Sequence, residues 1–437
     1  MIIGSGISSL IAASIILRKP NARIIITDRY DRPGGAWNDA YGHAQLEYDP
    51  ADFGIPSYPM SAFLAAQPHR ATGSQIGPPT VLEYADAVMR DHILASGRAA
   101  YFPAHEYLGS GRIRPIGEAR FKQIKIAKKV ISATRNGRWS RLQHVPCLSY
   151  ENEIDIVSPH ALAEDVRHLE SDYQRYCIIG AGTSGTDTAL YLLSSGIHSD
   201  RICWVKPREA WFLDPSIANP RIALNLANLV QEAVNVETLF ALMVQRGHTG
   251  RASTDITPSM HHAAPKPLSD LASLGAITQI IRKGHVRQIV PQGLVLNEGE
   301  EGMPKQTLYI DCSAKPVLPR ALPAIFQKDE INLQACALAD PCLSARMIAE
   351  IELLPGPNNV KNALCRPLAR PDTPLDFVRA LQQSFANQSA WGRHPSLRHW
   401  RSTSPNQVLT PEPETFAAAS QWLQSLIARR APSMDEG

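Results

Sequence analysis

Paired cysteines and long apolar runs are both missing from this chain. Its seven cysteines stand singly along 437 residues, with no Cys-x-x-Cys and no cluster at metal-ligand spacing. This excludes a disulfide-stapled secreted domain, argues against dithiol redox chemistry, and predicts a cytoplasmic protein without a bound metal. The longest apolar stretch, residues 10–17, is about half of a membrane span, and no basic leader precedes it. Neither a transmembrane helix nor a signal peptide is therefore expected.

An excess of charge of one sign is also absent. Lys+Arg 44 against Asp+Glu 41 leave a formal net charge of +3. This balance provides no general attraction to nucleic acid or to a membrane surface. The 44% hydrophobic and 19% charged residues are instead typical of a folded globular protein, and the length predicts two or three lobes.

A strand, a glycine turn and a helix are predicted at the start of the chain. The short apolar run at 1–3 leads into Gly4 and Gly6, and a β-branched strand then ends at Asp28. Gly4 permits a tight turn, and Gly6 lets the backbone approach a pyrophosphate at the helix N-terminus. A carboxylate at the end of the second strand would accept from a ribose hydroxyl. Together these features predict a dinucleotide site rather than an ordinary turn.

A second unit of the same kind is predicted further along the chain. A strand at 176–179 leads into the run Gly-Ala-Gly-Thr-Ser-Gly at 180–185, a helix and a strand at 201–205. That last strand ends in Lys206 and Arg208, where an NADH site would place an acid. Two cations there favour the 2′-phosphate of NADPH. The alternative interpretation is that both are solvated loop charges.

The two units, together with residues 28–37 (Asp-Arg-Tyr-Asp-Arg-Pro-Gly-Gly-Ala-Trp), resemble the plan of flavin-containing and Baeyer–Villiger monooxygenases. The resemblance implies an α/β fold with two nested Rossmann-like dinucleotide-binding folds, FAD in the first and NADPH in the second. For FAD it implies contacts from Gly4, Gly6, Ser8, Ser9, Asp28, Arg29, Gly34, Gly35, Trp37 and Pro341. For NADPH it implies contacts from Gly180, Gly182, Thr183, Ser184, Gly185, Lys206 and Arg208. For Pro341 a plain helix-entry proline is an equal alternative.

The resemblance also divides the chain into lobes. Residues 1–150 would be the first part of the FAD lobe, and 151–305 the NADPH lobe with a helical insertion at 216–284. A strand at 308–314 would return the chain to the FAD lobe, which 306–365 would complete, and 366–437 would be a C-terminal helical segment. The insertion is interpreted as a helical cover for the NADPH lobe, as a lid between the cofactors, or as both.

Two departures mark this chain as a divergent member. The monooxygenase fingerprint Phe-x-Gly-x-x-x-His is not reproduced at 154–160, because Ile156 stands where the glycine belongs, so His160 is interpreted as a loop residue. The late Ala-Thr-Gly of the resembled families is Cys-Ser-Ala at 312–314. The sequence therefore fits the larger group but neither subfamily.

Gln45 and Glu47 are the predicted catalytic residues. Counted from Trp37 and Tyr41, they fall where Baeyer–Villiger enzymes keep polar and charged groups beside the flavin. Neither position holds an arginine, so the sequence shows no cation beside the reacting oxygen. For Glu47 a solvated loop acid is the alternative.

The resemblance implies an NADPH-dependent FAD monooxygenase that uses O₂, through a C4a-peroxyflavin, to oxygenate a small organic substrate. The flavin would carry the chemistry, while the protein would orient the substrate and exclude water. A flavin-dependent dehydrogenase or reductase without oxygenation is one alternative. A catalytically degenerate nucleotide-binding protein is the other.

Overall fold

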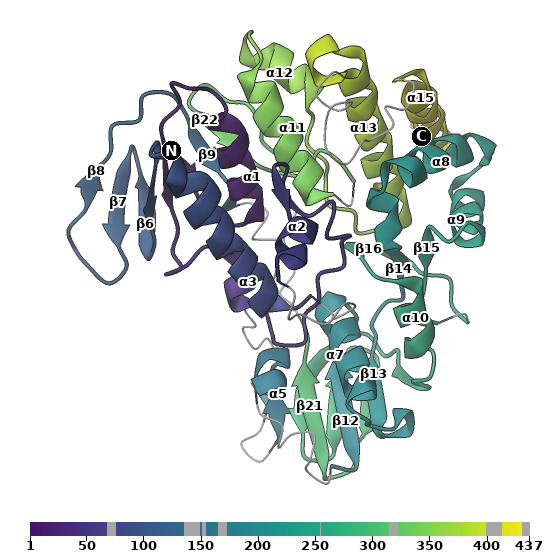
Figure 1. The fold of residues 1–437 in the computed structure, drawn as a ribbon. Helices are drawn as coiled ribbons and strands as arrows, with labels where there is room; N and C mark the ends of the chain where they lie inside the picture. Colours follow the sequence, from purple (N-terminus) through teal and green to yellow (C-terminus); the bar gives the residue numbers. More distant parts are fainter. Residues whose placement is uncertain are drawn as a thin grey trace, which may run out of the picture.

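A computed structural model describes residues 1–67, 76–134, 149–150, 154–164, 173–253, 255–313, 322–338, 340–398 and 413–430. Two five-stranded parallel sheets organise the described chain into an upper and a lower lobe, and a group of helices lies beside the upper lobe (Figure 1). Each sheet contains one of the two predicted strand–glycine–helix units. The predicted α/β class with two nucleotide-binding-type folds is therefore what the structure has.

The first sheet has the strand order β22-β9-β1-β2-β5, and all of its pairs are parallel. Helices α1 and α11 cover it and share its core, which the apolar side chains of both helices fill. The elements of this lobe are β1 (Ile2–Ile3), α1 (Ile7–Ile16), β2 (Ile24–Thr27), α2 (Met60–Ala65), α3 (Pro78–Ala87), β5 (Ala99–Phe102), β9 (Val130–Ser132), β22 (Glu330–Asn332), α11 (Pro341–Leu353) and α12 (Asn358–Leu364).

The second sheet has the order β11-β21-β12-β13-β17, again all parallel. Its three central strands are buried and rich in β-branched and aromatic residues, whereas the edge strands are half-buried. The elements are β11 (Ile156–Val157), α5 (Pro159–Glu164), β12 (Arg175–Ile179), α7 (Thr183–Ser194), β13 (Ile202–Val205), α10 (Leu268–Leu274), β17 (Gln279–Ile281) and β21 (Thr307–Asp311).

The structure corrects the predicted return to the first lobe. The strand expected at 308–314 is β21, which pairs with β12 and β11 in the second sheet. The strand that rejoins the first sheet is β22, which pairs with β9. β21 is a short, buried run and β22 has only Ile331 as an apolar residue, so composition alone could not assign either to a sheet. The predicted insertion at 216–284 likewise ends too late, because β17 within it is a strand of the second sheet.

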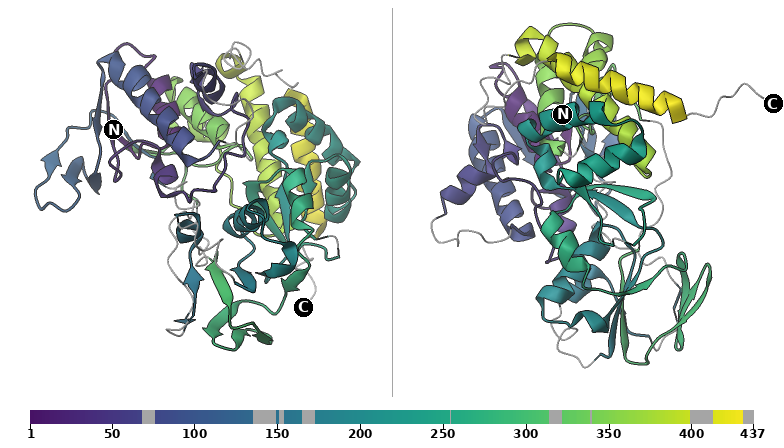
Figure 2. Two further views of the ribbon diagram at one scale, coloured as in Figure 1. Left: turned by 60° about the horizontal axis from the view of Figure 1, so that its bottom comes forward. Right: turned by 90° about the vertical axis from the view of Figure 1, so that its right-hand side faces the viewer.

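The insertion and the C-terminal segment together form a helical unit. Its helices are α8 (Pro220–Leu229), α9 (Val236–Gln245), α13 (Pro374–Arg393) and α15 (Pro413–Arg430). Their apolar faces share one core, in which Leu239 and Phe240 of α9 meet Phe377 of α13, and Phe416 of α15 packs against Phe385. α15 lies along α13 and α8 (Figures 1 and 2). The insertion therefore packs against the end of the chain.

Smaller sheets complete the fold. They comprise β3 (Gly54–Ile55) with β4 (Tyr58–Pro59); β6 (His105–Gly109), β7 (Arg112–Pro115) and β8 (Lys122–Gln123); β10 (Ser149–Tyr150), β18 (Val286–Val290), β19 (Gly293–Leu296) and β20 (Gly299–Gly302); and β14 (Ala210–Leu213), β15 (Thr249–Gly250) and β16 (Met260–Pro265).

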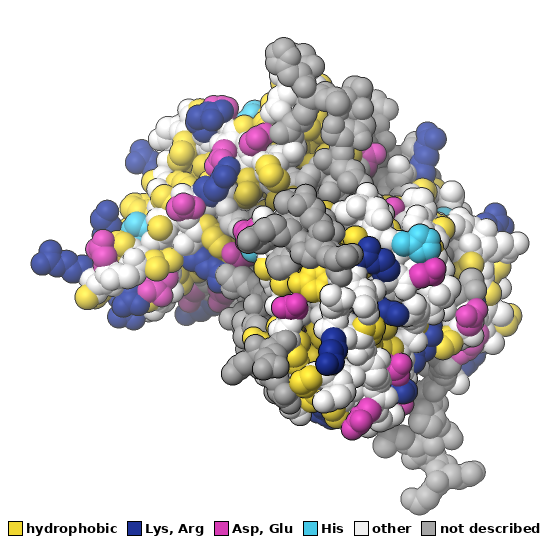
Figure 3. Space-filling view, turned by 90° about the horizontal axis from the view of Figure 1, so that it is seen from below, with side chains coloured by type: hydrophobic (Ala, Val, Ile, Leu, Met, Phe, Trp, Pro, Cys, Tyr) yellow, Lys and Arg dark blue, Asp and Glu magenta, His cyan; other side chains and the backbone are white. Residues whose placement is uncertain are grey.

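Seen from below, basic and acidic side chains are interspersed over the coloured surface (Figure 3). No helix in the described ranges is both long and apolar enough to cross a membrane.

Six cysteines lie in the described part of the chain, all free and buried. The fold nevertheless brings Cys177 opposite Cys203 on neighbouring strands, and Cys365 within hydrogen-bonding reach of Cys336. The hydrogen bond to Cys203, together with burial, raises the pKa of the Cys177 thiol well above its ordinary value.

Candidate functional site

The first glycine turn joins β1 to α1. Gly4 has a φ of 97°, a conformation that favours glycine, and its N–H donates to the Thr27 carbonyl at 2.8 Å. Gly6 caps α1 with an ordinary φ of −69°, and the first turn of α1 contains no acidic residue. Ser8 is half-buried in that turn, and Ser9 is fully buried behind it. The positive end of the helix dipole therefore faces the turn without an anionic side chain, as a phosphate site requires.

Asp28 is held against this turn at the end of β2. Its Oδ2 accepts from the Ser5 N–H at 2.5 Å and from the Ser5 hydroxyl at 2.6 Å, and its Oδ1 accepts from the Tyr30 N–H at 3.2 Å. The residue is buried. A carboxylate has about four acceptor positions, so one remains for a ribose hydroxyl.

The Gly34-Gly35 loop lies directly on the first turn. The Gly34 N–H donates to the Ser5 carbonyl at 3.0 Å, and φ is 124° at Gly34 and 58° at Gly35. A Cβ on Gly35 would stand 2.8 Å from the Gly6 Cα, closer than packed atoms come. Two backbones therefore meet where no side chain fits, which is a cradle suited to a ligand held by main-chain groups. Trp37 follows in the next turn and is half-buried, while Arg29 is exposed and pairs with Asp39 at 3.0 Å.

The second glycine turn is packed more tightly still. Gly180 has a φ of 113°, and a Cβ there would lie 2.8 Å from the Cys312 carbonyl oxygen. A Cβ on Gly185 would overlap the Gly180 carbonyl oxygen, which also accepts from the Trp204 indole at 2.8 Å. Gly182 caps α7, whose first turn, with Thr183 and Ser184, contains no acid. This N-terminus is a second place for a phosphate.

The two predicted 2′-phosphate ligands already have carboxylate partners. Lys206 is buried and its ammonium lies 2.6 Å from Glu209, which is also buried. Arg208 is exposed and makes two contacts of 3.1 Å with Asp372. Arg282, which follows β17, lies 3.4 Å from Glu209 and donates to the Ser253 hydroxyl at 3.2 Å. The cations expected at this strand end lie beside Glu209, an acid that the strand-end pattern did not predict.

An ionic cluster that the sequence did not predict joins the two lobes. Lys266, directly after β16, forms ion pairs with Glu47 and, at 2.6 Å, with Asp187 of α7. The Tyr41 hydroxyl donates to the other Asp187 oxygen at 2.6 Å. The Lys266 side chain is only 3% exposed. The predicted catalytic Glu47 is therefore a partner of a buried cation and not a solvated loop acid.

The charges of this cluster are set by burial and by one another. Burial opposes the charged ammonium of Lys266, but Asp187 and Glu47 outweigh it and raise the pKa of the lysine. Burial raises the pKa of Glu47, although Lys266 acts in the opposite direction. Burial also raises the pKa of Tyr41, and Asp187 adds to that effect. Lys266 thus stays positive in a place from which water is largely removed.

Unpartnered polar atoms lie next to this cluster. The His43 ring is stacked on Tyr191 and tilted against Tyr41, each at a centroid distance of 4.5 Å, and neither ring nitrogen has a partner among the described residues. Burial lowers the pKa of His43 to about 4. The Oε1 atom of Gln45, the other predicted catalytic residue, is likewise buried and has no partner in the described chain. Buried polar atoms are normally hydrogen-bonded, so these atoms are candidates for contact with a ligand.

Pro341 is the first residue of α11. Asp340 caps that helix by accepting from the Leu343 N–H at 2.7 Å. A proline at this position is ordinary helix-entry chemistry. His160, expected in a loop, lies in helix α5, where its side chain is exposed and pairs with Glu164 at 3.0 Å. No group of three or more metal-ligating side chains is found in the described ranges.

Lys266, Asp187, Glu209 and Arg282 are the residues that sequence reasoning missed. The available signal for Lys266 was a single cation between two prolines in an otherwise apolar stretch. Asp187 and Glu209 carried no signal, because their partners come from distant parts of the chain.

Comparisons with known proteins give similar chains of low identity. No family model matches the sequence. Uncharacterized proteins of Mycobacterium tuberculosis H37Rv and Mycobacterium bovis are each 29% identical over 420 residues, which is 94% of this chain and 77% of each relative.

Among solved structures, a mutant flavin monooxygenase from Stenotrophomonas maltophilia is 18% identical, with a TM-score of 0.46, and the match covers 80% of this chain and 96% of that one. The open form of cyclohexanone monooxygenase is 12% identical, with a TM-score of 0.47 and coverage of 83% and 86%. The function of this chain is therefore inferred from its own residues.

Proposed function

We propose that this protein is an NADPH-dependent FAD monooxygenase that transfers one oxygen atom from O₂ to a small organic substrate. The observation that carries the proposal is the junction at Lys266, where two strand–glycine–helix units meet around a buried cation. When bound, FAD accepts hydride and activates oxygen, and NADPH supplies the hydride.

The glycine turns would hold the two dinucleotides. Gly4, Gly6 and the Gly34-Gly35 loop, which pack closely at the start of α1, would offer main-chain contacts to the FAD pyrophosphate. Gly180, Gly182 and the first turn of α7 would do the same for NADPH. Asp28 has one acceptor position for a ribose hydroxyl. The residues present therefore fit both cofactors.

Lys266 would supply the positive charge that Gln45 and Glu47 cannot. Asp187 and Glu47 hold its ammonium at the junction and keep it protonated. In a site from which water is excluded, a fixed cation stabilises negative charge that develops next to it far better than it would in water. Glu47 is then a positioning residue that acts through Lys266. The buried Oε1 of Gln45 and the ring nitrogens of His43 are the groups that would contact a bound ligand.

A spectroscopic experiment with three outcomes tests this proposal. The purified protein should be yellow, and NADPH should bleach the flavin without oxygen. On admission of O₂, NADPH consumption should be coupled to oxygenated product in a panel containing a cyclic ketone, an alkyl sulfide and a tertiary amine. Complete conversion of the reducing equivalents to hydrogen peroxide with every compound would support a reductase. Absence of bleaching would support a nucleotide-binding protein without this chemistry.

A further inference from the structure

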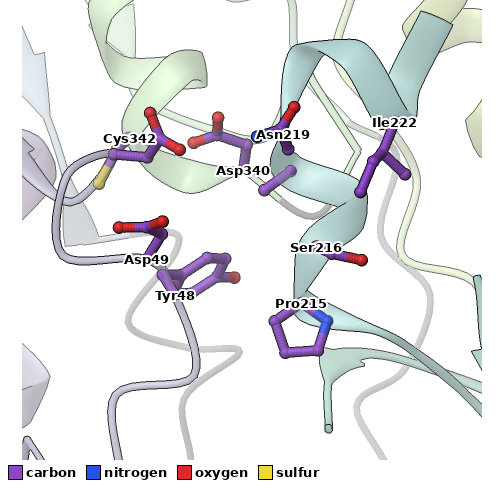
Figure 4. A pocket seen from close by; sticks show the side chains of 10 residues that line it. Tyr48, Asp49, Pro215, Ser216, Asn219, Ile222, Asp340 and Cys342 are labelled. Carbon is purple, nitrogen blue, oxygen red and sulfur yellow. The ribbon is translucent and has the colours of Figure 1, made fainter. Parts of the chain in front are cut away.

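The cavity lined by Tyr48, Asp49 and Asp340, with a volume of about 280 Å³, adjoins the sites already described (Figure 4). Glu47 and Pro341, the chain neighbours of these residues, belong to the predicted catalytic and FAD sites. A surface that neither nucleotide unit explains is the small sheet of β6, β7 and β8. This sheet projects from the edge of the upper lobe opposite the helical unit (Figures 1 and 2).

The even charge of the whole chain conceals a local excess on this sheet. Residues 105–129, which span its three strands and the segment after β8, contain seven Lys+Arg and two Asp+Glu, a net charge of +5. The rest of the chain contains 37 Lys+Arg and 39 Asp+Glu, a net charge of −2. An anionic surface would therefore attract the sheet and weakly repel the rest of the protein, so the two would meet through the sheet.

Most of these cations have no carboxylate partner in the described chain. Arg114 pairs with Glu106, and the Lys129 ammonium lies 3.2 Å from the Glu352 carboxylate. Glu118 is the one acid among the exposed residues of 116–128. The other five cations are exposed and form no ion pair with a described residue: Arg112, Arg120, Lys122, Lys125 and Lys128.

Two large apolar side chains stand among the cations. Ile116 is 53% exposed and Phe121 is 54% exposed, in the loop that joins β7 to β8. The Arg112 guanidinium lies over the Phe121 ring at 5.7 Å. Lysines on an edge strand such as β8 discourage pairing with another sheet, but exposed apolar side chains beside them do not serve that purpose. Apolar side chains set in a basic surface are instead typical of contact with an anionic bilayer.

The chemistry of this surface fits a lipid bilayer better than a nucleic acid. Ile116 has no ring that could stack on a base, and Gln123 is the only uncharged polar side chain in 116–125 that could bind a base edge. An anionic bilayer offers charged headgroups to the cations and an apolar region to Ile116 and Phe121.

We propose that the sheet of β6, β7 and β8 docks the protein on an anionic membrane surface. Ile116 and Phe121 enter the interface, and the five exposed cations lie at the headgroups. Each Lys or Arg near such a surface strengthens binding by about 5-fold, and the effect falls off within about 10 Å at about 0.1 M salt. Binding is therefore peripheral and reversible. It is independent of the proposed function, because neither glycine turn belongs to this sheet.

Sedimentation of the purified protein with lipid vesicles tests this proposal. At about 0.1 M KCl, phosphatidylcholine vesicles with about 30% phosphatidylglycerol should bind the protein about 10-fold more tightly than vesicles of phosphatidylcholine alone. Raising KCl to about 0.5 M should remove most of that difference. Arg120→Gln combined with Lys122→Gln should weaken binding to the anionic vesicles by about 10-fold or more, and Phe121→Ser by about 5-fold.

Two variants outside the sheet are the matched controls. Arg246→Gln combined with Lys305→Gln removes the same charge from exposed positions, and Val234→Ser removes an apolar side chain that is 64% exposed. Both should leave binding within about 2-fold of the unmodified protein. NADPH-driven flavin bleaching, recorded on the same samples, should not differ between the sheet variants and the unmodified protein.

Equal binding to the two kinds of vesicle, or equal effects of the sheet variants and their controls, would overturn the proposal. Tighter binding to a single-stranded oligodeoxynucleotide than to the anionic vesicles, at the same salt concentration, would also overturn it. Vesicle binding without flavin bleaching would remove the proposed function and keep the docking surface. Bleaching with coupled oxygenation but without vesicle binding would do the reverse.

Discussion

The ammonium of Lys266 lies 2.6 Å from the Asp187 carboxylate, which ties the segment after β16 to helix α7 of the second lobe. The same ammonium pairs with Glu47 of the first lobe. One buried cation is thus shared by three parts of the chain. Replacing it therefore tests folding and chemistry together.

Lys266→Met should destabilise the protein by about 3–5 kcal/mol, because Glu47 and Asp187 would remain buried without their cation. Urea denaturation measures this change. Lys283→Met is the matched control, since Lys283 and its partner Glu301 are about 40% exposed. The control should change stability by less than about 1 kcal/mol. Equal effects of the two variants would show that the Lys266 pairs contribute no more than a surface pair.

Glu47→Ala should leave the protein yellow and folded, because Lys266 keeps Asp187 as a partner. Product formation should fall well below the rate of flavin reduction, since the cation would lose one of the two groups that position it. The ratio of product to NADPH consumed is the readout. An unchanged ratio would leave Glu47 with a structural role only.

His43 should make the folded state sensitive to acid. Burial lowers its pKa to about 4 in the folded state, against an ordinary value of about 6.5. At a pH between these two values the unfolded state binds a proton at His43 and the folded state does not. The folded state is therefore most stable above pH 6.5 and loses stability as the pH falls toward 4. Between pH 7 and pH 5 the loss is about 2 kcal/mol. His43→Phe keeps the stacked ring and should lose about 2 kcal/mol less over that interval, measured by urea denaturation at both pH values. Parallel losses in the two proteins would refute this assignment.

Flavin reduction should be more efficient with NADPH than with NADH. A charged hydrogen bond is worth about 1.5–3 kcal/mol, so Lys206→Ala combined with Arg208→Ala should raise the NADPH Michaelis constant by about 10-fold or more and leave NADH use nearly unchanged. Because Glu209 holds Lys206 and approaches Arg282, Arg282→Ala should act in the same direction. Equal use of both cofactors by the unmodified protein would make these cations ordinary structural charges.

Gly6→Val should yield a folded but colourless protein. The Cβ of residue 6 would lie 3.6 Å from the Gly35 Cα, which is ordinary contact, but the added methyl groups would occupy the space beside the turn. Gly302→Val is the control, because a Cβ at this position in β20 would meet nothing closer than 3.9 Å and the residue is not part of the turn. Stoichiometric FAD in purified Gly6→Val protein, measured by absorbance, would place the flavin elsewhere.

Local patterns explain what the sequence could predict. A strand, a glycine turn and a helix follow one another within a few residues, so Gly4, Gly6 and Asp28 could be placed together without a structure. β21 could not be assigned to its sheet, because a buried apolar run pairs equally well in either one. Lys266 and Asp187 meet only through the tertiary fold, and a carboxylate in a helix is usually a surface residue. The sequence shows that positions 45 and 47 hold no arginine, but only the structure shows that Lys266 lies beside Glu47.

The shared core of α8, α9, α13 and α15 has a consequence for the order in which the protein can fold during synthesis. α9 ends at Gln245, whereas α13 begins at Pro374. While the ribosome makes the residues between them, the apolar faces of α8 and α9 lack the partners that α13 and α15 supply. Both sheets can be completed before these helices are covered, so nascent chains halted before Pro374 should bind chaperones through this surface. Release of α13 and α15 from the ribosome would then be the step that covers the apolar surface of α8 and α9.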